Sequence, residues 1–508
     1  MPAPYYDWIA RQAMRRPDKL AIVDLGDGRR FSYRDLDGRI ARVAGHLAAL
    51  GVTRGARVAT LLHNCAACLE IQFACGRLGA IFVPLNWRLT VPELTFIVND
   101  SGPLVIVHDA DLAAHAAVVA ERCHVPALLG ADGQGSAYEV AAASASPLAT
   151  HEPMSLDDTS TLMYTSGTTG QPKGAIITHG MTFWNAVNLN GPAGITPETV
   201  FLCTLPLFQT AGLNCYSNPV LHAGGTVLIA PRFDPTEILS WLGRRELGVT
   251  LFIGVPSQYL ILSQHPEFNS TDFGKVRATV GAAPMPVPLL ERYAARGVVL
   301  AQGYGMTETS PTVLFLEYED GIRKAGSAGK PVVHTQVRLV RPDGTDAAPG
   351  EIAELWVKGP NVTPGYWNRP DDNRASFSDG WLHTGDAARV DDEGYYYIVD
   401  RWKDMYISGG ENVYPAEVES VLYQLPAVAE TAVLGVPHER WGEIGRAMIV
   451  LRQGRTLTEA EVIAHCRANL AAYKIPHIVS FTDALPKNAT GKVLKRLLRE
   501  ILGILERP

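Results

Sequence analysis

One loop, residues 164–174, reads Tyr164-Thr165-Ser166-Gly167-Thr168-Thr169-Gly170-Gln171-Pro172-Lys173-Gly174. Its three glycines let the backbone approach an anion closely, while four serine or threonine hydroxyls and one lysine add donors and a positive charge. That mixture suits a polyphosphate. The loop is not a Walker A loop, because it has no Gly-Lys-Ser/Thr run and Pro172 blocks the required strand-loop-helix geometry. Ordinary flexible loops share this composition, so the motifs downstream must decide its role.

Length and composition indicate a globular enzyme of more than one domain. The chain has 508 residues, of which 47% are hydrophobic and 19% charged, and a chain of this length exceeds one compact core. Its net charge of −7 gives no sign of nucleic acid or of an anionic membrane as a partner. Small molecules are therefore the expected partners, and the oligomeric state is not indicated.

Cysteine usage and the chain ends favour a cytoplasmic location. Cys65 and Cys68 form a CxxC inside an apolar stretch that predicts a helix, so both are expected to pack in a core. Residues 1–17 contain no apolar signal segment, and no apolar run approaches the ~18 residues of a membrane span. The final residues, Glu506-Arg507-Pro508, are not a peroxisomal signal.

Strands and helices alternate through most of the chain. Strands are expected at 20–23, 58–62, 80–84 and 104–107, and again at 200–205, 225–230 and 249–254, with helices between them. Ser32 with Asp35 and Thr90 with Glu93 mark helix starts. The pattern predicts an α/β fold whose large N-terminal domain has doubly wound, mostly parallel sheets. The Ala/Ser-rich residues 141–149 are expected to form a linker ahead of the Gly-rich loop.

The second half adds a β-rich subdomain and a small α+β domain. Residues 336–357 contain turn signals at 342–344 and 349–350, which predict strands. Past Asp400 the order becomes helix, strand, strand, helix, strand and helix. We therefore expect an N-terminal domain over 1–400, a hinge over 401–404 and a mobile C-terminal domain over 405–508.

Two further motifs contain residues suited to a nucleotide. In Gly303-Tyr304-Gly305-Met306-Thr307-Glu308 the acid replaces the third glycine of a dinucleotide fingerprint. Tyr304 could stack on a base, and a Thr-Glu pair could position Mg²⁺ beside phosphate. In Gly380-Trp381-Leu382-His383-Thr384-Gly385-Asp386 the acid is placed to accept ribose hydroxyls. Each motif alone is equally consistent with a strand-end turn.

Two more motifs lie near the C-terminus. The first is Asp400-Arg401-Trp402-Lys403-Asp404, followed by Ser408-Gly409-Gly410-Glu411-Asn412. The second is Pro486-Lys487-Asn488-Ala489-Thr490-Gly491-Lys492. In order and spacing, the five motifs resemble those of the adenylate-forming superfamily, which comprises acyl-CoA synthetases, peptide-synthetase adenylation domains and luciferases. The resemblance extends from about residue 5 to 502.

The resemblance implies a role for each motif. ATP phosphates would be held by Thr165, Ser166, Gly167, Thr168, Thr169, Gly170 and Lys173. The adenosine and α-phosphate would be held by Gly281, Ala282, Ala283, Gly303, Tyr304, Gly305, Met306, Thr307, Asp386 and Arg401. Glu308 and Thr165 would hold Mg²⁺. The C-terminal domain would turn about Lys403, bringing Lys492 to the carboxylate in the first half-reaction, and Ser408, Gly409 and Gly410 to the pantetheine of coenzyme A in the second.

Physical reasoning agrees with this scheme. A carboxylate that attacks the α-phosphorus of ATP meets a repelling anion, so cations and positioning must supply most of the rate. Lys173, Lys492 and Mg²⁺ are the available cations. The acyl-adenylate formed is prone to hydrolysis, so water must be excluded. The thiol of coenzyme A then attacks the acyl carbon and AMP leaves.

The acyl pocket departs from the family pattern at one position. The family's acyl-CoA synthetases usually have Pro-x-Phe-His at the pocket mouth, whereas Pro206-Leu207-Phe208 is followed here by Gln209. Glutamine does not titrate near neutral pH and cannot pair with a substrate ammonium as an aspartate would. The expected lining is small or apolar, which fits an uncharged tail: Gln209, Thr210, Gly212, Leu213, Cys215, Val255, Gly281, Ala282, Pro311 and Val313.

We therefore predict an ATP-dependent acyl-CoA synthetase, an acid–thiol ligase. A medium- or long-chain fatty acid is the first expected substrate, and an aryl acid of cinnamate or benzoate type is the second. A carrier-loading ligase and a luciferase-like oxygenase remain as alternatives. A non-enzymatic nucleotide-binding module would leave Lys492 and the hinge without a purpose.

Overall fold

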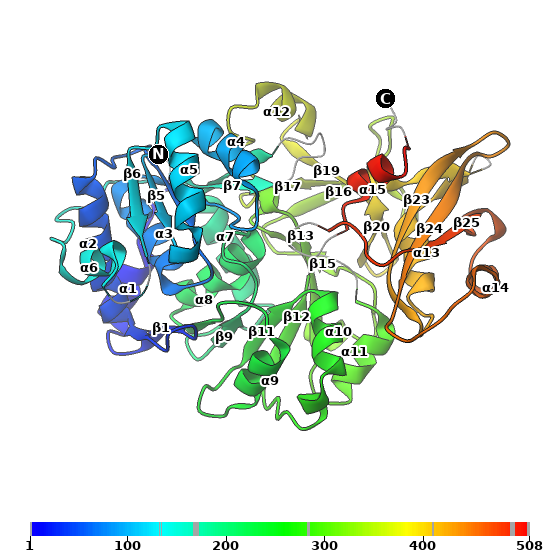
Figure 1. Ribbon diagram of the computed structural model, residues 1–508, viewed down its shortest axis with the longest axis horizontal. Helices are drawn as coiled ribbons and strands as arrows, with labels where there is room; N and C mark the ends of the chain where they lie inside the picture. Colours follow the sequence, from blue (N-terminus) through cyan, green and yellow to red (C-terminus); the bar gives the residue numbers. More distant parts are fainter. Residues whose placement is uncertain are drawn as a thin grey trace. The chain divides into compact units, whose positions relative to one another are not determined.

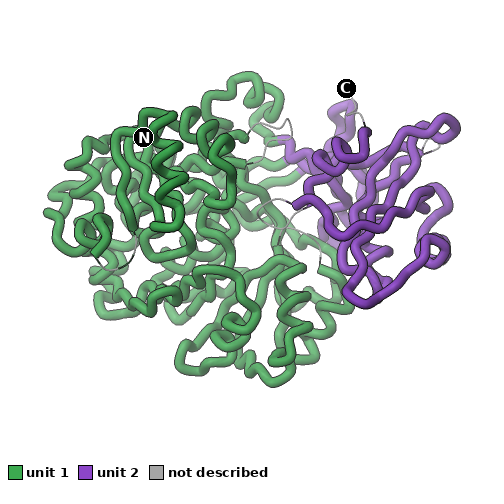
Figure 2. The backbone as a smooth tube through the Cα atoms, viewed as in Figure 1, with its two compact units in different colours: residues 1–337, 357–382 green, residues 338–356, 383–508 purple. Residues whose placement is uncertain are grey.

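A computed structural model describes residues 3–131, 133, 135–165, 172–281, 285–408, 411–487 and 493–504. Two compact units are present, and Figure 2 draws them in different colours. Unit 1 comprises 1–337 and 357–382, and unit 2 comprises 338–356 and 383–508. The β-rich residues before position 400 therefore pack with the C-terminal residues. The predicted hinge at 401–404 concerns movement and stays a prediction.

Unit 1 contains two large sheets, both mostly parallel (Figure 1). The first has six strands in the order β6 (Ala127–Gly130), β5 (Val105–His108), β3 (Arg57–Leu61), β4 (Ile81–Pro84), β7 (Thr159–Thr165) and β8 (Lys173–Thr178). The second runs β15 (Lys330–Pro331), β14 (Thr312–Leu316), β13 (Leu300–Gly305), β12 (Arg277–Val280), β11 (Leu251–Gly254), β9 (Val200–Cys203), β10 (Thr226–Ile229), β1 (Leu20–Asp24) and β2 (Arg30–Ser32).

Helices cover these sheets on both faces, which is why their strands read as continuous apolar runs. Alternate residues of one strand enter different cores: Val58 packs with residues of α2 (Tyr33–Ala49) and α3 (Ala66–Leu78), whereas Ala59 packs with α4 (Val91–Ser101) and α5 (Ala113–Cys123). The second sheet has α9 (Pro235–Gly243), α10 (Pro256–Gln264) and α11 (Val287–Ala294) on one face. The core that contains α2 and α3 also contains residues of α7 (His179–Asn190), α8 (Asn218–Ala223) and both sheets.

Most sequence expectations for unit 1 are confirmed. The predicted strands occur within one or two residues of their expected ends, and both capping boxes form. Cys68 and Cys75 are buried in α3, with Cys65 at its N-cap. The linker prediction was wrong at its start, because α6 (Ala137–Ser144) continues to position 144 and buries Ala141 and Ala142 against α2. The remaining helices are α1 (Trp8–Arg15) and α12 (Pro370–Ser376).

Two smaller sheets follow. One contains β16 (Gln336–Val340), β17 (Ala353–Lys358), β19 (Trp381–Val390) and β18 (Phe377–Ser378), with β20 (Tyr396–Arg401) paired to β19. The other contains β22 (Glu411–Val413), β21 (Tyr406–Ser408), β24 (Gly442–Leu451) and β23 (Val428–His438), with β25 (Ile478–Phe481) paired to β24. Its helices are α13 (Pro415–Leu422), α14 (Glu459–Asn469) and α15 (Lys495–Ile501).

The C-terminal order of helices and strands is the predicted one, except that the short β21 and β22 were missed. Each has only three residues, which is too few for an alternating pattern to appear. In the part of the chain that the structure describes, no helix is both long enough and apolar enough to cross a membrane.

Candidate active site

The ends of the Gly-rich loop belong to two paired antiparallel strands. Thr165 ends β7 and lies opposite Lys173, the first residue of β8. Tyr164 lies opposite Gly174, and its ring would be only 3.0 Å from a Cβ at that position, so the glycine lets the two strands approach. Residues 166–171, which include the predicted phosphate ligands Ser166, Gly167, Thr168, Thr169 and Gly170, lie outside the described residues.

Lys173 is held by two partners from a later part of the chain. Its ammonium forms an ion pair with Asp372 of α12 and lies 5.6 Å from the centre of the Tyr366 ring. The lysine side chain is 14% exposed, while the aspartate is 32% exposed. Asp372 is partly exposed, so breaking its ion pair costs little free energy, because water can hydrate the released carboxylate. A phosphate can therefore replace Asp372 as the partner of Lys173.

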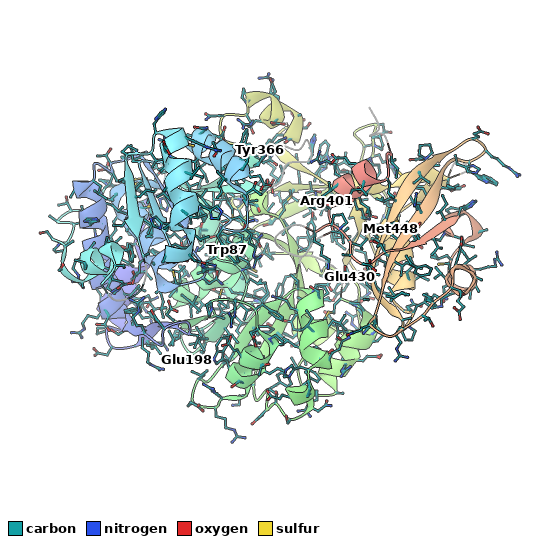
Figure 3. The ribbon with its side chains drawn as sticks, in the orientation of Figure 1. Trp87, Glu198, Tyr366, Arg401, Glu430 and Met448 are labelled. Carbon is teal, nitrogen blue, oxygen red and sulfur yellow. The ribbon has the colours of Figure 1, made fainter. Side chains whose placement is uncertain are left out.

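Glu308 is brought to the same tyrosine. It lies in a 3₁₀ turn, η4 (Thr307–Thr309), directly after β13, and only 6% of the residue is exposed. One carboxylate oxygen accepts a 2.7 Å hydrogen bond from the Tyr366 hydroxyl. Tyr366, labelled in Figure 3, therefore contacts the predicted phosphate-binding lysine with its ring and the predicted metal-binding acid with its hydroxyl.

Sequence reasoning missed Tyr366 and Asn361, because neither belongs to a Gly-rich motif. Asn361 is fully buried and donates to the carbonyls of Thr309 and Thr312 at 3.0 and 2.9 Å, which fixes the turn after Glu308. The backbone of Glu308 is also fixed, since its carbonyl accepts a 2.7 Å bond from the amide of Thr363.

The adenine-side motif lies at the carboxyl ends of two parallel strands. β12 and β13 are paired with Val280 opposite Gln302, so Gly281 and Gly303 follow at neighbouring positions. Gly305 is required there, because a Cβ would lie 1.7 Å from the carbonyl oxygen of Pro311. Tyr304, Met306 and Thr307 are partly exposed at this edge, which is where α/β sheets bind ligands. Ala282 and Ala283 lie outside the described residues.

The donor set suits Mg²⁺. This ion prefers hard oxygen ligands and phosphate, and Glu308 supplies a carboxylate whose position is fixed by Tyr366. Among the described residues, the Thr165 hydroxyl makes one long contact, 3.5 Å to the carbonyl of Lys173. Glu308 and Thr165 are therefore the residues that would hold the ion beside the phosphates.

The predicted acyl-pocket residues come from three neighbouring segments. Gln209 and Thr210 are partly buried before a π-helix, η2 (Ala211–Ser217), which contains buried Gly212 and Leu213. Asn185 of α7 donates to the carbonyl of Asn214 and accepts from the amide of Thr312, so this π-helix is tied to the strand with Pro311 and Val313 at its start. Val255 follows β11, which lies between β9 and β12.

Burial keeps this lining uncharged. Cys215 is partly buried, and its apolar surroundings raise the pKa of its thiol to about 12. Gly212 has no room for a side chain, because a Cβ would be 2.2 Å from the carbonyl of Pro206. The buried Asn64 holds the preceding segment through the carbonyl of Leu205 and the amide of Leu207, at 2.9 and 2.8 Å. Sequence reasoning also missed Asn64.

In unit 2 the predicted ribose pair is formed. Asp386 and Arg401 are cross-strand partners on β19 and β20, and a 2.7 Å ion pair joins Arg401 Nε to Asp386 Oδ1. The Asp386 side chain is 6% exposed and that of Arg401, labelled in Figure 3, is 33% exposed. Gly385, with φ of 70°, gives the bend that precedes the acid, and its amide donates to Glu354.

The remaining predicted residues of unit 2 are described only in part. Ser408 is buried at the end of β21. Lys403 lies in a 3₁₀ turn, η6 (Trp402–Asp404), and its side chain lies outside the described part of the chain. Gly409, Gly410 and Lys492 also lie outside the described residues. The roles proposed for them therefore rest on the sequence.

Comparisons with known proteins cover nearly the whole chain. The AMP-binding enzyme family matches residues 9–367, and the AMP-binding enzyme C-terminal domain matches 417–492. A feruloyl-CoA synthase from Amycolatopsis sp is 44% identical over 499 residues, with 98% of each chain covered. The long-chain-fatty-acid–CoA ligase FadD13 of Mycobacterium tuberculosis is 38% identical, with 97% of each covered. O-succinylbenzoate coenzyme A synthetase of Bacillus subtilis, solved with ATP and magnesium, has a TM-score of 0.87 and 34% identity over 98% of this chain and 100% of that one.

Proposed function

The chain belongs to the AMP-binding enzyme family, and on that premise we propose which acid it activates and which residues act. As a member of the family's CoA ligases it is an AMP-forming acid–thiol ligase, and its reactants are a carboxylic acid, ATP with Mg²⁺, and coenzyme A. The first half-reaction makes an acyl-adenylate and pyrophosphate. The second transfers the acyl group to the thiol and releases AMP.

The proposed acid is an aryl acid of the cinnamate type, the second of the two substrates predicted from the sequence. The support is that a relative at 44% identity is named for feruloyl-CoA, whereas the relative named for long-chain fatty acids is at 38%. The lining agrees, since the predicted pocket residues are apolar apart from the amide of Gln209 and the hydroxyl of Thr210. An amide donates and accepts, which suits a ring with a hydroxyl or methoxy group.

The observation that carries the catalytic proposal is the position of Tyr366 between Lys173 and Glu308. It places a cation over the ring and a carboxylate at the hydroxyl of one rigid side chain, as polyphosphate and a divalent ion together require. In the proposal, Lys173 leaves Asp372 for a phosphate, and Thr307 contacts the α-phosphate. Lys492 stabilises the charge that develops as the carboxylate attacks.

The sequence motifs supply the rest of the proposal. Tyr304 stacks on adenine, and Asp386 with Arg401 holds the ribose hydroxyls. Ser408, Gly409 and Gly410 line the path of pantetheine after the domain turns about Lys403. A cytoplasmic location stays a prediction.

The test is release of AMP and pyrophosphate by the full chain, with and without coenzyme A, over matched panels of aryl and fatty acids. We expect AMP release that depends on coenzyme A, with the highest kcat/KM for a cinnamate. A fatty acid as the best substrate would contradict the aryl proposal. Accumulation of the adenylate at a rate that coenzyme A does not change would instead indicate a carrier-loading ligase. The control is Lys173→Gln, which should raise the KM for ATP without changing the order of acids.

A further inference from the structure

A partly buried charge cluster of unit 2 lies beside the predicted hinge. Asp400 is the last residue but one of β20, three residues before the hinge residue Lys403. Glu419 lies on α13, and Lys495 begins α15, both after the hinge. These three residues, Asp400, Glu419 and Lys495, are named here the clasp.

Lys495 is the centre of the clasp. Its ammonium lies 2.8 Å from a carboxylate oxygen of Glu419, and the charges of Asp400 and Asp404 are near enough to act on its pKa. Burial alone would lower the pKa of Lys495, but the three acids outweigh burial and raise it. A partly buried lysine surrounded by acids is held firmly, because moving it away from them would leave their charges uncompensated.

Asp400 is tied to the elements that follow the hinge. One of its carboxylate oxygens accepts a 2.8 Å bond from the amide of Ala416, in the first turn of α13. The other accepts from the amide of Arg401 at 2.7 Å, so the residue that orients the ribose-binding arginine also holds α13. Carboxylates are favoured at helix N-termini, where backbone amides are unpaired.

A second charge contact lies beside the clasp, and both of its residues follow the hinge residue Lys403. Asp404 is four residues after Asp400, and Arg499 is four residues after Lys495 on the same face of α15. Arg499 Nη1 lies 3.1 Å from Asp404 Oδ1. Both members of this pair follow Lys403, whereas Asp400 precedes it. Rotation about Lys403 would therefore keep the Asp404–Arg499 pair and separate Asp400 from Lys495 and Ala416.

α15 is also fixed to the body that would rotate. Leu498 is 3% exposed and packs with Ala432, Leu434 and Met448 of β23 and β24; Met448 is labelled in Figure 3. The segment before the helix is closed at its base, because Lys487 and Val493 are bridged and the amide of Leu494 donates to the carbonyl of Pro486 at 2.8 Å. Lys492 lies in the chain between these bridged residues.

We propose that Asp400 and Lys495 are positioning residues. The hydrogen bond from Ala416 to Asp400, helped by the charge of Lys495, stabilises one of the two domain orientations and opens when the enzyme changes half-reaction. The proposal rests on the proposed function, because it assumes that the two half-reactions need different orientations. The clasp sets the balance between the orientations. It does not touch substrate, so its loss changes how often each orientation is sampled.

The experiment compares Asp400→Asn, Lys495→Met and Arg499→Met with the wild-type full chain. Single-turnover rates are measured for adenylate formation and, from pre-made adenylate, for thioester formation. We expect the ratio of the two rates to change about tenfold or more in the two clasp variants, because one rate falls while the other holds or rises. Arg499→Met is the matched control, since it removes a charge pair of the same helix that does not cross the hinge, and its ratio should stay within about twofold.

A second readout is independent of activity. Trypsin cleaves after Arg401 and Lys403, so initial cleavage there reports how often the hinge opens. We expect cleavage several times faster in Asp400→Asn than in wild type or Arg499→Met. Should Lys495→Met fail to fold, the double variant Asp400→Asn/Lys495→Met, which removes charges of both signs, replaces it.

Two outcomes would overturn the clasp. One is a pair of half-reaction rates that fall by the same factor in Asp400→Asn, and the other is cleavage no faster than in Arg499→Met. A failure of the proposed function appears differently, as full adenylate formation in Lys492→Ala. That result would show that Lys492 is not the catalytic lysine. The rate ratio and the trypsin cleavage would still decide whether Asp400 restrains the hinge.

Discussion

Each unit holds a lysine among acids, but the two lysines are held differently. Lys173 of unit 1 pairs with one aspartate on a short surface helix and faces a tyrosine ring. Lys495 of unit 2 pairs with Glu419, whose side chain is only 17% exposed, and the charges of Asp400 and Asp404 also act on it. The first arrangement leaves a cation that can be transferred to a ligand. The second fixes a cation where no ligand is expected.

The two lysines suggest different tasks for the two units. An ion pair that a ligand can replace suits Lys173, because this residue would bind a new ATP in every cycle. A charge cluster with several acids suits a hinge between two domains. We therefore expect changes in unit 2 to separate the two half-reactions. Changes in unit 1 should alter how substrates bind and leave the ratio of the half-reactions nearly constant.

The largest effect is expected from Gly409→Leu in unit 2. A side chain at this position would occupy the space that pantetheine needs for close approach to the backbone. Thioester formation should fall to the limit of detection while adenylate formation, measured by pyrophosphate exchange, persists. Gly409→Ala serves as the graded control and should lose less. An equal loss of pyrophosphate exchange would show that the loop serves folding or ATP, and that unit 2 does not separate the half-reactions.

Lys492→Ala should lower adenylate formation by on the order of 10²-fold or more, because a cation at the attacking carboxylate is lost. Thioester formation from pre-made adenylate should remain nearly intact. Lys487→Ala is the matched control from the same motif, since Lys487 forms an ion pair with Glu430 of β23. If both half-reactions fall equally in Lys492→Ala, the division of work between the units is wrong for this residue.

Gln209→His in unit 1 should shift the preference among acids and leave the KM for ATP unchanged. An imidazole differs from an amide in shape and donor pattern, and a pocket change of this size is worth about 10- to 200-fold at most. The measurement is kcat/KM for a series of fatty and aryl acids, with the exposed Gln264→His as control. A uniform drop for every acid would place Gln209 outside the pocket. A new ionisation near neutral pH would show that this position can support proton chemistry.

The smallest effect is expected from Asp372→Asn. Removing this charge lowers the cost of moving Lys173 to a phosphate, so the KM for ATP should fall by no more than about fivefold, as for other partly exposed ion pairs. Steady-state kinetics with ATP varied give the value. Asp371→Asn is the control, because Asp371 pairs with Arg374 in the same helix. A higher KM would mean that Asp372 positions Lys173 for ATP, and the contrast between the two lysines would weaken.

Local patterns predicted the parts of the fold that depend on neighbours in the chain. The strands of unit 1 and the capping boxes at Ser32 and Thr90 occur where their periodicity and side-chain chemistry predicted. The prediction failed at residues 141–144, where small residues that resemble a linker form the buried end of α6. Alanine favours a helix as readily as it fills a loop, so contact with α2 decided the outcome.

The candidate site shows the same limit. Glu308, Asp386 and Arg401 belong to recognisable motifs, whereas Tyr366, Asn361 and Asn64 do not, although each holds a motif residue or pocket segment in place. Their partners lie 58, 52 and 143 residues away in the chain. A single hydrogen bond across such a distance leaves no periodic trace in the sequence.

The family, the order of the elements and the residues proposed to bind ATP could be read from the sequence, because Gly-rich loops and their acids are contiguous and chemically distinctive. The tertiary structure alone decided the partners: Tyr366 between Lys173 and Glu308, and Asp400 beside Lys495. It also decided that residues 383–400 pack with the C-terminal residues. The physical reason is that burial and charge pairing depend on which distant segments the folded backbone brings together.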